Sequence, residues 1–156
     1  MRSILAAALL LISVAAPAWA GPKETVETRT YDVDASTIED MRAEMTAKGP
    51  EGYWAYTTWY VSWSSGCDVE VRIIFTFPNW TAYDDAPANL QERWDSFMEH
   101  LEAHEEGHAE NGRGAAQEIE DTRCGEDPYA ILRNWANEDK NYDSETDHGR
   151  TQGAVF

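Results

Sequence analysis

One long helix constrains this fold more than any other feature of the sequence. An apolar stripe runs along residues 89–119, stepping by four, three and four residues from Leu90 through two aromatic side chains to Leu101. Residues with this spacing share one helical face, so the pattern predicts a helix that buries that face. The same steps lead next to His104 and His108. The helix is therefore expected to present two imidazoles where its buried face opens into a cleft.

The two histidines belong to the pattern His104-Glu105-Glu106-Gly107-His108, or H-E-x-x-H. Imidazoles at positions i and i+4 of a helix can bind one Zn²⁺, and a glutamate after the first can take a proton from a water that the ion polarises. Glu105 lies about 100° from His104 around the helix, whereas Glu106 faces the opposite side. Glu105 is therefore the candidate catalytic base. An ordinary amphipathic helix that carries histidines is the alternative interpretation.

Three glycines fall in the second half of this helix, at Gly107, Gly112 and Gly114. Each lowers the intrinsic stability of the helix by about 1 kcal/mol. They indicate either that another segment or a substrate approaches the helix closely, or that the helix frays after Gly112. The sequence leaves this choice open.

The first twenty residues have the pattern of a secretory signal peptide. Arg2 precedes an apolar run over residues 4–16, and Ala18-Trp19-Ala20 provides small residues at a cleavage site. The run is too short for a membrane span. We therefore expect an exported protein, periplasmic or secreted, whose mature chain starts at Gly21 and forms one domain over residues 21–156.

The formal net charge of −17 limits the classes of partner. So acidic a chain is not expected to bind nucleic acid or an anionic membrane surface, both of which repel it. We expect a highly solvated monomer.

Cys67 and Cys124 are the two cysteines of the chain. In an exported protein an even count favours one disulfide bond. Two zinc-binding thiolates are the alternative, although neither cysteine has the C-x-x-C spacing of structural zinc sites.

The segments before the long helix predict β-strands around a hairpin. Residues 25–33 alternate and are rich in β-branched side chains, as in a strand. Residues 54–63 are bulky on both faces, which favours a central strand. They are joined through a turn at residues 64–66 to a partner strand at residues 68–77, which Pro78 should end. The prediction is an antiparallel sheet with a central hairpin.

Two shorter helices complete the predicted α+β fold. The first covers residues 37–48, with Ser36 as its N-cap, and the second covers residues 128–137 and starts with a proline. Asn89 is the expected N-cap of the long helix. By composition residues 139–156 form a polar tail, which we expect to fold back to the metal site because it contains the last histidine.

A catalytic zinc ion usually has three protein ligands, so one must come from outside the helix. His148 in the tail is the favoured third ligand. The other candidates are the carboxylates of Asp143, Glu145, Asp147 and Glu118. Glu118 is disfavoured because it lies about 15 Å along the helix from His108. His100, one turn before the motif, is disfavoured as a third ligand because three histidines on one straight helix seldom converge on one ion. It is otherwise a candidate for a contact behind the metal ligands or with substrate, or is a plain surface histidine.

Several of these features together resemble a known family. They are the signal peptide, Gly49-Pro50, Thr58 and Trp63, Cys67, Trp94 with H-E-x-x-H, and the tail Tyr142-Asp143-x-x-Thr146-x-His148-Gly149-x-Thr151-Gln152-Gly153. The chain resembles a bacterial domain-of-unknown-function family described as predicted secreted zinc-dependent proteases. The resemblance implies a zincin-like domain in which His104 and His108 bind the metal and Glu105 is catalytic. It also strengthens His148 as the third ligand.

The expected function is that of a secreted zinc-dependent metallopeptidase. Glu105 would act as general base on a metal-activated water that attacks a peptide bond. Tyr142 and Arg150 are candidates for stabilising the oxyanion or contacting the peptide or protein substrate. The alternative is a non-catalytic zinc-binding or protein-interaction domain of the cell envelope.

Overall fold

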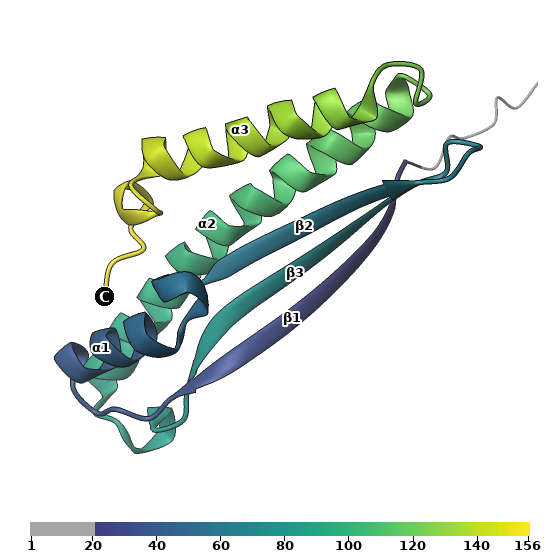
Figure 1. Ribbon diagram of the computed structural model, residues 1–156. Coiled ribbons are helices and arrows are strands. Elements are labelled where there is room, and N and C mark those ends of the chain that lie inside the picture. The colour runs from purple at the N-terminus through teal and green to yellow at the C-terminus, as the bar shows by residue number, and fades with distance from the viewer. Residues whose placement is uncertain (1–20) are drawn as a thin grey trace, which may run out of the picture.

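The computed structural model describes residues 21–156 (Figure 1). The signal peptide predicted at residues 1–20 lies outside the described residues. In chain order the elements are β1 (Lys23–Val33), α1 (Ile38–Lys48), β2 (Tyr56–Trp63), β3 (Val69–Trp80), α2 (Ala88–Asp121) and α3 (Pro128–Thr146). This is the expected α+β class, with α2 lying between α3 and the sheet (Figure 1). No helix among the described residues is long and apolar enough to cross a membrane.

The sheet is mixed rather than antiparallel, which corrects the sequence-based prediction. Its strand order is β1-β3-β2, with β1 parallel and β2 antiparallel to β3. The central strand is therefore β3, and β2 lies at an edge. The prediction took bulky side chains on both faces of β2 as the mark of a buried central strand. Tyr60 on the outer face is instead 57% exposed, and no second layer among the described residues covers it.

The central strand β3 is longer than predicted, because it continues through Pro78 to Trp80. Pro78 pairs with Tyr31 of the parallel neighbour β1. On the other side of β3, pairing with β2 extends only as far as Thr76, which lies opposite Tyr56, the first residue of β2. Beyond that point β3 has one neighbouring strand among residues 21–156, and a proline is tolerated where a strand has a free edge.

Helix boundaries also differ from those predicted. Thr37, rather than Ser36, caps α1, since its hydroxyl accepts a hydrogen bond from the amide of Asp40 (3.2 Å). The long helix α2 begins after Pro87 without a side-chain cap, so Asn89 is not its N-cap. The largest difference is in α3, which runs to Thr146 through residues predicted as tail.

Close packing explains the glycines of α2, and the helix does not fray. A Cβ atom at Gly107 would lie 2.2 Å from the hydroxyl oxygen of Tyr142, and one at Gly114 would lie 2.3 Å from the Trp135 ring. Both aromatic residues are on α3, seven residues apart like the two glycines. The missing side chains therefore let α3 pack directly against α2, and its polar sequence is helical because one face is held there.

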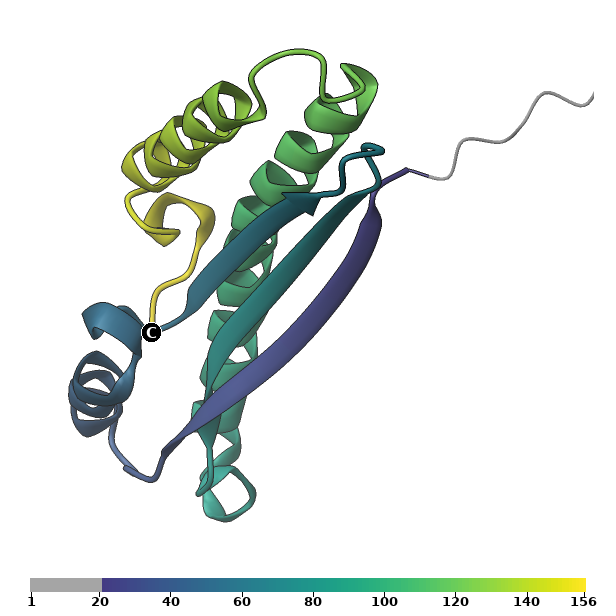
Figure 2. The ribbon, with the colours of Figure 1, turned by 45° about the vertical axis from the view of Figure 1, so that its right-hand side comes forward.

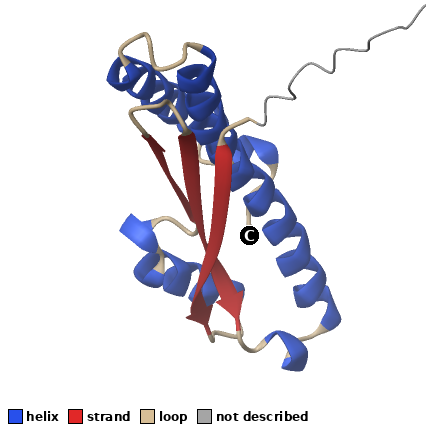
Figure 3. Cartoon of the chain, turned by 90° about the vertical axis from the view of Figure 1, so that its right-hand side faces the viewer, coloured by secondary structure: helices blue, strands red, loops and turns tan. Residues whose placement is uncertain are grey.

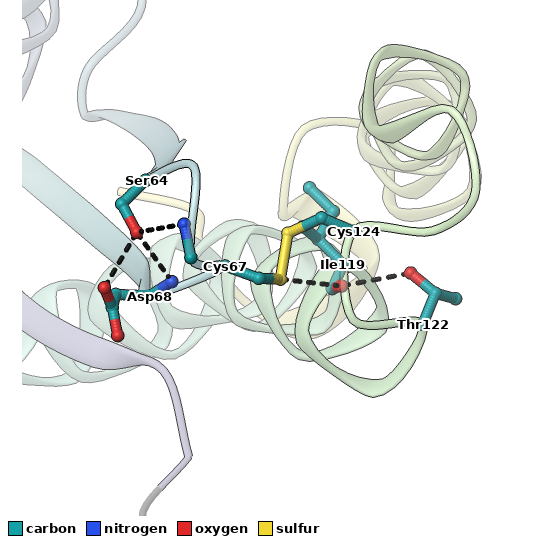
Figure 4. The surroundings of a disulfide bond; sticks show 7 residues. Ser64, Cys67, Asp68, Ile119, Thr122 and Cys124 are labelled. Carbon is teal, nitrogen blue, oxygen red and sulfur yellow. Dashed lines mark hydrogen bonds between the residues drawn. A yellow bond between two sulfur atoms is a disulfide. The ribbon is translucent and has the colours of Figure 1, made fainter.

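The predicted disulfide bond between Cys67 and Cys124 is present, which excludes the zinc-thiolate alternative. It joins the turn before β3 to the loop after α2, with a Cα–Cα distance of 5.8 Å (Figure 4). It fixes the end of the long helix to the end of the hairpin, on the side of the molecule away from α1.

Two hydrophobic cores lie along α2, which crosses one face of the sheet (Figures 2 and 3). We call the first the aromatic core; it includes Trp80, Trp94, Phe97, Leu101 and Phe156. The second, the aliphatic core, includes Val71, Ile73, Ala116, Ile119 and Ile131. The H-E-x-x-H motif falls between the two on α2. The segment after α3 returns toward α1 and places Phe156 in the aromatic core (Figure 2).

Candidate metal centre

His104 and His108 lie on the buried face of α2, as their phase predicted, and are 3% and 7% exposed. Asp143 of α3 faces both rings. One of its carboxylate oxygens, Oδ1, is 3.3 Å from Nε2 of His104 and 3.1 Å from Nε2 of His108. The ligand atoms of these three residues all lie within 4.8 Å of one another. Two imidazole nitrogens and a carboxylate oxygen thus converge on one point.

Oxygen atoms lie behind both imidazole rings. Nδ1 of His108 is 2.9 Å from Oδ1 of Asp139, which also accepts a hydrogen bond from Asn111 (2.9 Å). Nδ1 of His104 is 2.9 Å from Oε1 of Gln152. These oxygens only accept, as does Oδ1 of Asp143, but for each ring the oxygen at Nδ1 is closer than Asp143 is to Nε2. The proton of a neutral imidazole is therefore favoured on Nδ1, and Nε2 faces the point of convergence. Metal-binding histidines are usually oriented in this way, so the donor set fits a divalent cation such as Zn²⁺.

Glu105 is buried beside the two histidines, with 4% of its surface exposed. Its Oε2 accepts a 2.7 Å hydrogen bond from the hydroxyl of Thr57 on β2. Burial raises the pKa of Glu105 to about 7, and the Thr57 hydrogen bond opposes this rise. Glu106 instead points outward and pairs with Arg113 at the surface. The predicted distinction between the two glutamates is therefore confirmed.

The two imidazoles have different electrostatic surroundings. Burial lowers the pKa of His104, and its hydrogen bond to Gln152 and the nearby Asp143 carboxylate oppose this shift only in part. Burial also lowers the pKa of His108, but the hydrogen bond and charge of Asp139, with the charges of Glu105 and Asp143, outweigh it, so the net shift is upward. The same pairing keeps the pKa of Asp139 below its ordinary value despite burial. The lowered pKa of His104 favours the neutral imidazole, which is the metal-binding form.

A cavity of about 630 Å³ opens onto this group. Its walls come from the segment that leads into β2, the buried face of α2, one face of α3 and the turn after α3. The residues concerned include Tyr53, Tyr56, Thr57, Leu101, His104, Glu105, Asp143 and His148. Glu105 and both buried histidines therefore line the wall of this cavity.

His148, the predicted third ligand, lies at the rim of this cavity rather than in the compact group. Its side chain is 50% exposed, and its Nδ1 is 3.3 Å from the same Oδ1 of Asp143 that faces the other histidines. Its ring lies against Tyr53, with centroids 5.3 Å apart. Asp143 thus completes the three-residue group, while a role for His148 as a ligand stays a prediction.

The remaining predicted residues are distributed around the site. Arg150 lines the cavity and pairs with Asp147 (3.3 Å). The hydroxyl of Tyr142 donates to the main-chain carbonyl of His104 (3.2 Å), so it lies behind the ligands. His100 is outside the group, with Nδ1 2.6 Å from the carbonyl of Ser96. Glu118 accepts from the indole of Trp135 (2.7 Å), far from the ligands along the helix, and Glu145 is exposed.

Four residues of the site were missed from sequence: Thr57, Asn111, Asp139 and Gln152. Asp139 and Asp143 share the i, i+4 spacing of His104 and His108, so a helical assignment of the tail would have placed both carboxylates opposite the histidines. No local pattern marks Thr57. Gln152 belongs to the tail pattern that carries the family resemblance, but its spacing does not indicate that it approaches His104.

Comparison with models of known protein families identifies the family of this chain. The family described as "Bacterial protein of unknown function (DUF922)" matches residues 28–149, and the chain belongs to it. The match covers all three strands in whole or part and the whole H-E-x-x-H motif. Searches of curated proteins and of solved structures give no match.

Proposed function

We propose that this protein is an exported zinc-dependent metallopeptidase. The observation that carries the proposal is the buried Glu105 beside His104 and His108, whose Nε2 atoms converge with Asp143 at the wall of an open cavity. His104, His108 and Asp143 would hold the ion, and His148 would complete its coordination from the rim. The disulfide bond supports an oxidising compartment outside the cytosol.

Glu105 is the proposed general base. When bound, the ion would supply Lewis-acid activation of a water molecule and of the substrate carbonyl. Thr57 holds Oε2 of Glu105, which leaves Oε1 free to accept the proton of the attacking water. Burial raises the pKa of this carboxylate toward neutrality, so it can accept a proton and later return it to the leaving amine.

In the part of the chain that the structure describes, the outer edge of β2 has no neighbouring strand, which supports a peptide as substrate. Tyr56 and Thr57 begin this edge strand and line the cavity. An extended peptide can pair with such an edge through its main chain, which would carry a scissile bond past Glu105. Arg150 at the cavity wall remains the candidate for stabilising the oxyanion, since the proton of the Tyr142 hydroxyl is used elsewhere.

The test uses residues 21–156 loaded with zinc, a broad peptide library, and two matched variants. We expect Glu105→Gln to retain stoichiometric zinc and to lose cleavage, because the amide cannot accept the proton. Glu106→Gln, which changes the neighbouring exposed glutamate, should cleave like the parent. Equal cleavage by all three proteins would refute the role of Glu105. Zinc binding without cleavage by the parent would favour a non-catalytic zinc-binding domain instead.

A further inference from the structure

The turn after α3 is shaped to fit against His104. Asp147, His148 and Gly149 have positive φ angles of 49°, 51° and 81°, which reverse the chain at the end of α3. Gly149 then lies so close to the His104 ring that a Cβ atom would be 2.9 Å from it. A side chain at this position would be both strained and obstructed. The reversal brings the following residues, including Gln152, behind the imidazole.

Gln152 takes part in a closed cycle of hydrogen bonds. Its Oε1 is 2.9 Å from Nδ1 of His104, and its Nε2 donates to the hydroxyl of Tyr142 (3.0 Å). That hydroxyl donates in turn to the main-chain carbonyl of His104 (3.2 Å, against 3.3 Å to Oε1 of Gln152). The Tyr142 ring is stacked on the His104 ring, with centroids 5.1 Å apart and planes 14° apart. The cycle thus starts and ends at His104.

This cycle determines which end of the Gln152 amide faces the imidazole. A side-chain amide has an accepting oxygen at one end and a donating NH₂ group at the other. The Tyr142 hydroxyl has one proton, and the His104 carbonyl is its nearer acceptor (3.2 Å, against 3.3 Å to Oε1 of Gln152). Its shortest contact with Gln152 is the 3.0 Å hydrogen bond that it accepts from Nε2. The NH₂ group must then point at Tyr142, and the oxygen must point at Nδ1 of His104.

We propose that Gln152 is a positioning residue that, oriented by Tyr142, fixes the Nδ1–H tautomer of His104 and so makes Nε2 its metal-binding atom. An inverted amide would donate to Nδ1 and force the proton onto Nε2, which could then not bind a cation. His108 needs no such control, because its partner Asp139 is a carboxylate that accepts in either orientation. The proposal rests on the metal binding in the proposed function and does not depend on peptide cleavage.

The tautomer can be read directly by NMR on metal-free, ¹⁵N-labelled residues 21–156. Long-range ¹H–¹⁵N spectra at about pH 9, where imidazoles are neutral, distinguish Nδ1–H from Nε2–H. We expect one Nδ1–H form for both His104 and His108 in the parent. In Gln152→Leu and in Tyr142→Phe, His104 should become a mixture of tautomers, while His108 stays unchanged as an internal control.

Zinc affinity, measured by competition with a chelator, gives the second readout. Gln152→Leu and Tyr142→Phe should each weaken zinc binding by about 10-fold to 100-fold, as for other partners of metal-bound histidines. Adding Gln152→Glu to Tyr142→Phe should restore both the single tautomer and the affinity, since a carboxylate needs no orienting hydroxyl. Urea unfolding of each variant separates this effect from a loss of fold.

Three results would overturn the proposal: an Nε2–H form of His104 in the parent, an unchanged tautomer in Gln152→Leu, or no rescue by Gln152→Glu. A parent that binds zinc without cleaving peptides would count against the peptidase alone. A parent with the Nδ1–H tautomer that binds no zinc would remove the metal site and, with it, the role of Gln152 in metal binding.

Discussion

The hydroxyl of Thr57 donates a 2.7 Å hydrogen bond to the carboxylate of Glu105, joining the edge strand β2 to the middle of α2. The same hydroxyl is 3.2 Å from the main-chain carbonyl of Glu105. Both residues are buried. The orientation of the proposed general base therefore depends on a strand that is remote from it in sequence and that also lines the cavity.

Replacing Thr57 by valine keeps the shape of the side chain and removes the hydroxyl. A lost hydrogen bond to a buried carboxylate is worth about 1.5–3 kcal/mol, so we expect kcat for peptide cleavage to fall by roughly tenfold or more. Zinc content should not change, because Thr57 does not contact the ligands. Thr57→Ser should restore most of the rate. A valine variant as active as the parent would show that Glu105 is positioned without this bond.

The ligand set can be resolved by three alanine variants and one assay of zinc affinity. Asp143→Ala removes the carboxylate that faces both buried imidazoles, and we expect it to weaken zinc binding by more than about 100-fold, beyond the loss typical of indirect partners. His148→Ala should also weaken binding sharply if the rim histidine is a ligand. His100→Ala is the control and should bind like the parent. Equal affinities in the His148 and His100 variants would exclude His148.

Gly114 tests the packing of α3 on α2 at a distance from the ligands. Alanine normally stabilises a helix relative to glycine by about 1 kcal/mol. Here the new Cβ atom would lie 2.3 Å from the Trp135 ring, so we expect Gly114→Ala to lower the free energy of unfolding by about 1–3 kcal/mol instead.

Urea denaturation measures the effect, and Gly66→Ala serves as its control. The nearest atoms to a Cβ at Gly66 are 3.6 Å away, which is ordinary contact. That variant should unfold like the parent. A stabilised Gly114→Ala protein would mean that α3 can move away from α2 at little cost.

The disulfide bond should contribute strongly to stability. It joins cysteines that are 57 residues apart, a separation for which restriction of the unfolded chain gives about 4 kcal/mol. We expect the double variant Cys67→Ser, Cys124→Ser to unfold at a correspondingly lower urea concentration. An unchanged midpoint would show that the native packing of the hairpin end and the helix end already provides this restraint.

Local periodicity predicted the part of the site that belongs to one helix. The spacing of the stripe placed His104 and His108 inward and separated Glu105 from Glu106, because a helix fixes these directions whatever packs against it. Partners from other elements could not be predicted in this way. Thr57 reaches Glu105 only because β2 is the strand nearest to α2, and a sequence pattern does not state the order of strands in a sheet.

The same limit explains the errors in the fold. The side chains of β2 are bulky on both faces, but this property does not determine whether the strand has one neighbouring strand or two. The parallel pairing of β1 with β3 is a contact between distant segments that no local pattern encodes. The polar sequence of α3 resembles a tail because its helix is stabilised by one narrow face, where Trp135 and Tyr142 meet glycines of α2.

The position of the site between the two cores has a consequence for cooperativity. On α2, the residues before His104 pack in the aromatic core and those after His108 in the aliphatic core. Neither core contains all the groups that surround the ion, since the loop with Gln152 is fixed near the first and α3 is fixed to the second. Metal affinity would therefore report whether both halves of the domain are folded at once, and a bound ion would make the two halves unfold together.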